Sequence, residues 1–137
     1  MRIFFDSSAY AKRWVEESGS QEVEDLCVRA SEVCLSIICV PEIVSALSRR
    51  VREKSLTRVE YTQSRTRLLE DANDAIIVSL TSTVVQTCIT VLETASVRTL
   101  DAIHIASAIE SRADLFVSSD HRQVAVAKSL GLETKQV

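Results

Sequence analysis

Short runs of consecutive hydrophobic residues alternate along the chain with longer segments in which hydrophobic residues recur every three or four positions. The short runs are typical of strands buried on both faces, and the longer segments are typical of amphipathic helices. The expected strands are residues 2–5, 33–36, 75–80 and 115–118, with an edge strand at 133–136. The expected helices are residues 7–14, 20–30, 41–51, 57–74, 82–95, 99–111 and 122–130. Because helices separate the strands, we expect an α/β fold with a mostly parallel central sheet of four to five strands flanked by helices.

Polar residues at the expected helix starts support this division. Thr57 opens the sequence Thr-Arg-Val-Glu, which is a capping box at the start of a long polar helix. Ser7 or Ser8 is expected to cap the first helix, and Thr99 the helix over 99–111. Pro41 stands where a first helical residue belongs.

Composition narrows the class of protein further. The chain has 137 residues, of which 46% are hydrophobic, and contains only 2 Gly and 1 Pro. These values favour one domain over residues 1–137 and exclude a turn-rich all-β fold and a disordered chain. No signal peptide or membrane-spanning run is visible, so a cytoplasmic protein without a membrane partner is expected. The four cysteines lack metal-site spacing and are expected to be free: Cys27, Cys34, Cys39 and Cys88.

Four acidic residues occupy positions where ligands gather in parallel α/β folds, namely the carboxyl ends of strands and the helix starts that follow them. Asp6 ends the first expected strand, and Asp120 lies just past the fourth. Glu42 and Asp101 fall in the first turns of their helices. Taken singly, each could serve only as a helix cap, a dipole partner or a turn residue. Asp101, however, belongs to a helix that is apolar nearly all round, so its carboxylate is expected to point inward.

Carboxylates that converge repel one another unless a cation lies between them. Oxygen ligands suit Mg²⁺ or Mn²⁺, and such an ion can activate water and stabilise the oxygens of a displacement at phosphorus. The residues therefore predict a metal-dependent site for phosphoryl transfer, provided that the four acids meet in the fold.

Four segments occur in order along nearly the whole chain: IFFDSSAYAKRWVEESGS, PEIVSALSRRVRE, RTLDAIHIASAIE and ADLFVSSDHRQVAVAKSLGL. They resemble the signature blocks of PIN-domain ribonucleases, and most closely those of VapC toxins from type II toxin–antitoxin pairs. The resemblance implies a three-layer PIN fold in which Asp6, Glu42, Asp101 and Asp120 bind Mg²⁺ or Mn²⁺ and act in catalysis. It also implies endoribonuclease activity on a structured RNA such as tRNA, leaving 5′-phosphate and 3′-hydroxyl ends. A cognate antitoxin and a homodimer are the partners that it implies.

Other residues are candidates for supporting or substrate-binding roles. By the same resemblance, Ser8 and Ser119 match hydroxyl positions beside the first and last acids. His121 replaces a residue that is frequently Arg or Lys in the family, and it could meet substrate phosphate. Basic residues near the acids are further candidates for phosphate contacts: Lys12, Arg13, Arg49, Arg50, Arg52, Arg98 and Arg122. Tyr10 and Trp14 are expected to pack together in the core rather than stack on bases.

Three alternatives stay open at this point. His104 is expected to be a buried histidine paired with a carboxylate or backbone group, but a general base in metal-free RNA cleavage is the competing interpretation. A catalytically silent PIN domain could bind RNA or protein only, and a receiver-type signalling domain also carries an acidic Mg²⁺ pocket. The net charge of −3 does not exclude nucleic acid, because setting the four acids aside leaves 15 acidic against 16 basic residues.

Overall fold

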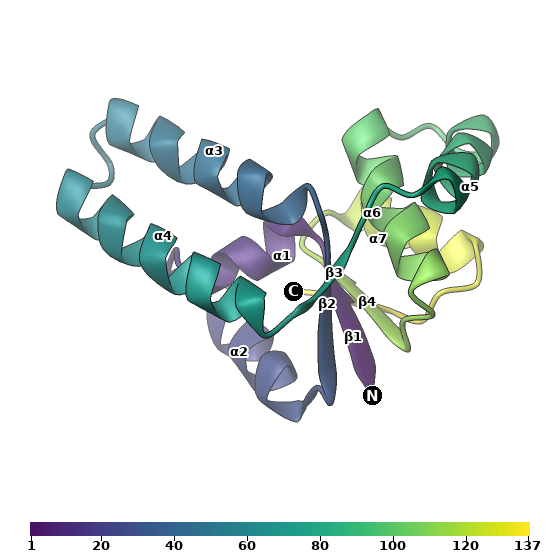
Figure 1. The fold of residues 1–137 in the computed structure, drawn as a ribbon, viewed down its shortest axis with the longest axis horizontal. Coiled ribbons are helices and arrows are strands. Elements are labelled where there is room, and N and C mark those ends of the chain that lie inside the picture. The colour runs from purple at the N-terminus through teal and green to yellow at the C-terminus, as the bar shows by residue number, and fades with distance from the viewer.

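One sheet of five parallel strands, in the order β3-β2-β1-β4-β5, organises the computed structural model, which describes residues 1–137 (Figure 1). The strands are β1 (Arg2–Phe5), β2 (Glu32–Ser36), β3 (Ile76–Val78), β4 (Leu115–Ser118) and β5 (Thr134–Gln136). The helices are α1 (Ser7–Tyr10), the 3₁₀ helix η1 (Ala11–Arg13), α2 (Ser20–Arg29), α3 (Cys39–Arg52), α4 (Arg58–Asn73), α5 (Ser82–Thr94), α6 (Thr99–Glu110) and α7 (His121–Ser129). All the expected elements are therefore present. The strand order differs from the 2-1-3-4-5 order of receiver domains, which removes that alternative.

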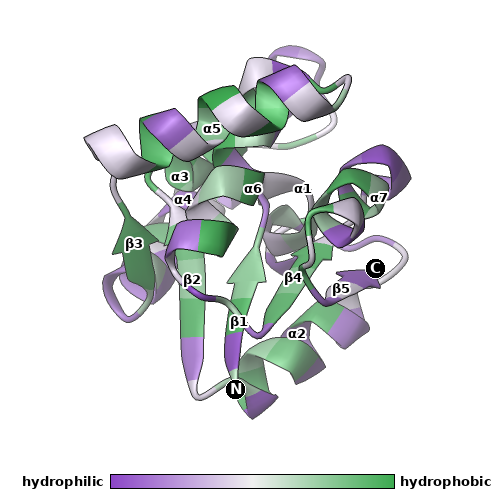
Figure 2. Ribbon diagram, turned by 90° about the vertical axis from the view of Figure 1, so that its right-hand side faces the viewer, coloured by the Kyte–Doolittle hydropathy of each residue, from purple (hydrophilic) through white to green (hydrophobic).

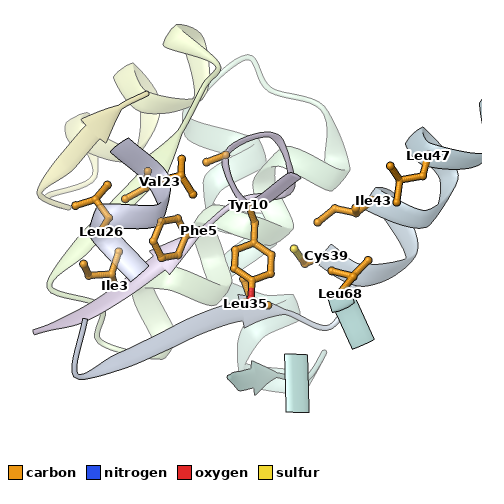
Figure 3. Close-up of a cluster of buried hydrophobic side chains, with 12 residues drawn as sticks. Ile3, Phe5, Tyr10, Val23, Leu26, Leu35, Cys39, Ile43, Leu47 and Leu68 are labelled. Atoms are coloured by element: carbon orange, nitrogen blue, oxygen red, sulfur yellow. The ribbon is translucent and has the colours of Figure 1, made fainter. Parts of the chain in front are cut away.

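Helices cover both faces of the sheet because successive side chains of each buried strand point to opposite sides. Phe5 and Leu35 face α1, α2, α3 and α4, and they lie in the cluster drawn in Figure 3. Phe4 and Phe116 face α5, α6 and α7 in a second cluster, with their rings stacked at 5.9 Å. Figure 2 shows that β3 and most of β1, β2 and β4 are hydrophobic, whereas the edge strand β5 is hydrophilic. The three-layer α/β architecture is thus confirmed.

Three helix starts differ from the sequence-based expectation. Asp6, and neither of the serines that follow it, caps α1 by accepting a hydrogen bond from the backbone N–H of Ala9 at 2.9 Å. Thr99 is the first residue of α6, and Arg98 holds the N-cap position without a side-chain hydrogen bond. Pro41 is the third residue of α3, because that helix begins two residues earlier. Helices α6 and α3 therefore start one and two residues earlier than expected, and α1 is capped by the acid that follows β1.

Helices α3 and α4 lie side by side and extend away from the sheet; we call residues 39–73 the arm (Figure 1). The expected capping box is present, since Thr57 and Glu60 each bond the backbone N–H of the other at 3.1 Å. Leu68 is the one residue of α4 that is fully buried. The long polar helix therefore contacts the rest of the fold through a narrow strip.

Two further sequence expectations can be compared with the fold. All four cysteines are free, and three of them are buried, as expected. None of the helices combines the length and hydropathy that crossing a bilayer demands.

Candidate active site

Asp6 is the most deeply buried of the four acids, with 2% of its surface exposed. The β1–β4 register pairs Phe5 with Val117, so the next step along both strands brings Asp6 beside Ser118. The Ser118 hydroxyl donates to Asp6 Oδ2 at 2.6 Å. The Ser8 hydroxyl lies 2.8 and 2.9 Å from the two carboxylate oxygens. Both oxygens of Asp6 are therefore held in place by hydrogen bonds from α1 and from the end of β4.

Burial raises the pKa of Asp6, and the hydrogen bonds from Ser118, the Ala9 N–H and Ser8 oppose that rise without cancelling it. No basic side chain forms an ion pair with this carboxylate. An ionised carboxylate at such a depth is costly unless a cation compensates it. A cation bound beside Asp6 would therefore lower the free energy of the folded protein.

Glu42, in the first turn of α3, is bound by two side chains from other segments. The Ser7 hydroxyl donates to Glu42 Oε1 at 2.6 Å, and His104 Nε2 lies 2.6 Å from the same oxygen. Burial alone would raise the pKa of Glu42, but the hydrogen bonds from His104 and Ser7 outweigh it and lower the pKa. The expected pairing of buried His104 with a carboxylate is confirmed, and Glu42 is its partner.

Asp101 and Asp120 line one cavity of about 610 Å³. The remaining residues that line it are Ser96, Val97, Arg98, His121, Arg122 and Gln123. Asp120 caps α7, since its Oδ1 accepts the Arg122 N–H at 2.9 Å. Asp101 does not point into the core as expected, because its side chain is 24% exposed and lies 3.5 Å from Arg98 Nε. Its place in the first turn of α6 puts it at the cavity, while later turns of that helix are buried.

Short bridges connect these acids at the carboxyl edge of the sheet. The Ser118 hydroxyl that binds Asp6 also accepts the backbone N–H of Asp120 at 3.0 Å. Gln123, buried in α7, reaches the backbone oxygen of Asp101 at 3.4 Å. No three His, Cys, Asp or Glu side chains are close enough together to hold a metal ion in this arrangement. The donor set is nevertheless carboxylate and hydroxyl oxygen, which fits Mg²⁺ or Mn²⁺ and not zinc.

The family model for the PIN domain matches residues 3–129. The chain belongs to the PIN domain family. A search of curated proteins by sequence finds no match.

Among solved structures, this PIN domain is similar to VapC20 of Mycobacterium tuberculosis, described as a toxin that cleaves the sarcin-ricin loop, with 14% identity and a TM-score of 0.72. That match covers 98% of this chain and 99% of the other. VapBC-1 of nontypeable Haemophilus influenzae matches at 9% identity and a TM-score of 0.72, over 99% and 98% of the two chains. VapBC2 of Rickettsia felis, bound to a DNA fragment from its promoter, matches at 11% identity and a TM-score of 0.71, over 100% of this chain and 99% of the other. At such identities the likeness concerns the fold.

The hydroxyl that supports the first acid of this PIN domain comes from Ser118 rather than Ser119. Ser119 takes part through its backbone, because its N–H donates to the Ser8 hydroxyl at 3.1 Å. Sequence reasoning also missed Ser7, the hydroxyl donor to Glu42. The alternation of side chains along β4 was the available signal, since Ser118 shares the buried face of Phe116.

Arg13 lies apart from the acids of the PIN site. It forms ion pairs with Glu24 at 2.9 Å and Asp71 at 3.1 Å, which join it to α2 and α4. Its guanidinium lies 5.4 Å from the centre of the Tyr10 ring and 5.2 Å from that of Trp14. The two rings pack edge to face at 4.9 Å, as expected for core packing. Arg13 therefore links η1 to α2 and α4, and it lines a cavity other than that of Asp101 and Asp120.

Proposed function

We propose that this PIN domain is an endoribonuclease that depends on Mg²⁺ or Mn²⁺. The observation that carries the proposal is the buried carboxylate of Asp6, which forms no ion pair and is linked through the Ser118 hydroxyl to the backbone of Asp120. An unpaired buried carboxylate lowers the stability of the fold, and groups perturbed in this way cluster at functional sites. A bound cation would offset this cost at Asp6. Membership of the PIN family supports the same conclusion.

The residues fit the ion that the proposal needs. Asp6, Glu42, Asp101 and Asp120 would hold it. When bound, the ion would supply an activated water and neutralise charge on the phosphodiester. Hydroxyls fix both oxygens of Asp6, and His104 fixes the orientation of Glu42.

Two residues at the edge of the cavity can act on substrate. Arg98 is 87% exposed and forms an ion pair with Asp101 at the cavity, which places its guanidinium where a phosphate beside the scissile bond would lie. His121 lines the same cavity and begins α7. We assign both to substrate binding, and we assign Ser8 and Ser119 to support of the acids.

The biological setting that we propose is that of a toxin. Solved structures with this fold include toxins and toxin–antitoxin complexes. By this analogy, residues 1–137 form a single cytoplasmic PIN domain that cuts a structured RNA such as tRNA, forms a homodimer and is suppressed by a cognate antitoxin.

The Asp101→Asn variant tests the proposal. It keeps the size of the side chain but removes the charge that would bind the ion, so RNA cleavage should be abolished while the circular dichroism spectrum is unchanged. Asp74→Asn, an exposed acid at the end of α4, is the matched control and should cleave at the wild-type rate. EDTA should stop cleavage by the wild type, and Mn²⁺ should restore it. Cleavage by Asp101→Asn at the wild-type rate would refute the proposal.

Growth assays separate catalysis from binding. If the protein acts by cutting RNA, induction of Asp6→Ala should leave growth normal where the wild type arrests it. Retained growth arrest with Asp6→Ala would instead favour the catalytically silent binding domain.

A further inference from the structure

Another cavity, of about 320 Å³, lies between α3 and α4 in the outer half of the arm. Five residues line it, of which two are arginines and two carry a hydroxyl: Ser48, Val51, Arg52, Arg58 and Tyr61. We call this cavity the arm pocket. None of its polar side chains forms an ion pair or a side-chain hydrogen bond within the protein. Two guanidinium groups therefore border one small space together with two hydroxyls and no acid.

The surrounding segment is strongly basic. Residues 49–67 contain seven of the 16 basic residues but only two of the 19 acidic ones, so they carry +5 while the rest of the chain carries −8. No basic residue of this segment takes part in an ion pair. Of the two acids, Glu60 is occupied by the capping box at Thr57. Since like charges at close range repel, this distribution is suited to a bound anion.

The turn at the end of the arm carries a further cation, Lys54. Lys54 follows α3 with φ of 60°, a conformation in which glycine is favoured and a side chain costs about 1 kcal/mol. The chain nevertheless carries a lysine at this turn.

Three of the residues that line the arm pocket lie on α3, the helix that also carries Glu42. Arg49 follows Glu42 by seven residues and returns to the same side of the α-helix, whereas Arg52 follows it by ten residues and lies about 80° around the helix axis. At 1.5 Å per residue they lie about 10 and 15 Å from Glu42 along the axis. A DNA strand advances about 3.4 Å per nucleotide in a duplex, so an axial distance of about 15 Å between Glu42 and Arg52 corresponds to about four nucleotides.

We propose that the arm pocket binds a backbone phosphate of the RNA substrate, about four nucleotides from the bond that is cut. This inference rests on the proposed function and adds to it a site that selects substrates by length and shape. Guanidinium groups bind phosphate oxygens in a bidentate manner, and the hydroxyls of Ser48 and Tyr61 can donate to the same group. Substrates too short to reach the arm pocket lose this contact.

The test compares the double variant Arg52→Gln/Arg58→Gln with the control Arg29→Gln/Lys128→Gln, which removes two exposed cations at the ends of α2 and α7. Binding of a fluorescein-labelled RNA hairpin is measured by anisotropy at several salt concentrations, with Asp101→Asn added so that the RNA is not cut. The slope of log K against log salt should become less steep by about 0.7–0.9 for the arm variant, because the contact with one phosphate is lost. The control slope should stay at the wild-type value.

A cleavage assay with Asp101 intact gives an independent measurement. The ratio of kcat/KM for the hairpin to that for an RNA of about three nucleotides, too short to reach the arm pocket by the spacing above, should fall at least tenfold in the arm variant and not in the control. If the slope becomes less steep as expected but the wild type cuts no RNA, phosphate binding in the arm pocket is supported and the proposed function is refuted. If the wild type cuts the hairpin and neither slope nor ratio changes, the arm pocket is refuted. An unchanged slope with lost affinity for the antitoxin would assign the pocket to a protein partner and refute the phosphate.

Discussion

Replacing Asp6 by asparagine should make the metal-free protein more stable. Asparagine is as good an N-cap as aspartate, so the hydrogen bond from the Ala9 N–H to the side-chain oxygen can persist. The hydroxyls of Ser8 and Ser118 can rotate to accept from the new amide. The substitution therefore removes a buried charge while keeping the hydrogen bonds around it.

The magnitude follows from the burial of this carboxylate. Asp6 is 2% exposed and has no ion-pair partner, so the cost of holding its charge is of the order of 1–2 kcal/mol after the hydrogen bonds are counted. For a domain of this size, about 1–2 kcal/mol raises Tm by roughly 3–8 °C. Because the folded pKa of Asp6 is raised, the native state holds the proton more tightly than the unfolded state. The advantage of the variant should thus be absent below about pH 4 and grow as pH rises through the folded pKa.

Thermal and urea unfolding in EDTA at pH 7, repeated with saturating Mn²⁺, measure this prediction. With Mn²⁺ at about 100 times its Kd the wild type should gain about 2.7 kcal/mol, whereas Asp6→Asn should gain little, so the order of stability reverses. Asp120→Asn is the control in EDTA, because its side chain is at the cavity and not buried, and its unfolding free energy should change by less than about 0.5 kcal/mol. An Asp6→Asn variant less stable than the wild type in EDTA would refute the reasoning.

Three further predictions concern other parts of the fold. Lys54→Gly should raise the unfolding free energy by about 0.5–1 kcal/mol in urea titrations, because it relieves the backbone at φ 60°; a loss of stability would contradict this. Leu68→Ala should cost about 2–5 kcal/mol and exposed Leu69→Ala less than about 0.5, and equal effects would argue against the packing of α4 described above. Glu42→Gln should lower the unfolding free energy by about 1 kcal/mol at pH 7, because the hydrogen bonds that lower the pKa of Glu42 stabilise the folded protein while this carboxylate is ionised. This stabilisation should be lost as pH falls below about 4, so a difference that does not depend on pH would refute the role of the charge.

The sequence was informative wherever a rule acts within a few residues. Hydrophobic runs and helical spacing located every strand and helix, and the capping box at Thr57 was identified because its partners are three residues apart. The positions of Asp6 and Asp120 at strand ends were also local facts. Local polarity was less reliable at α1 and α6. Asp6, the residue after β1, caps α1, and no side chain caps α6.

Supporting residues were harder to predict, because their roles depend on which segments meet. Side-chain alternation along β4 puts Ser118 on the face of Phe116, but the contact of Ser118 with Asp6 depends on the register of β1 against β4. Arg13 is close to Asp6 along the chain, yet its ion pairs with α2 and α4 take it to another cavity.

By itself, then, the amino-acid order determined the type and sequence of the elements, the α/β class and the presence of an acid at each of four segment ends. The tertiary structure alone decided that His104 meets Glu42, 62 residues away, and that Arg52 and Arg58 border one pocket. The physical reason is the range of the forces involved. Backbone preference and hydrophobic period act within one or two turns, whereas strand order, register and helix packing are chosen by how the two faces of the sheet bury their side chains together.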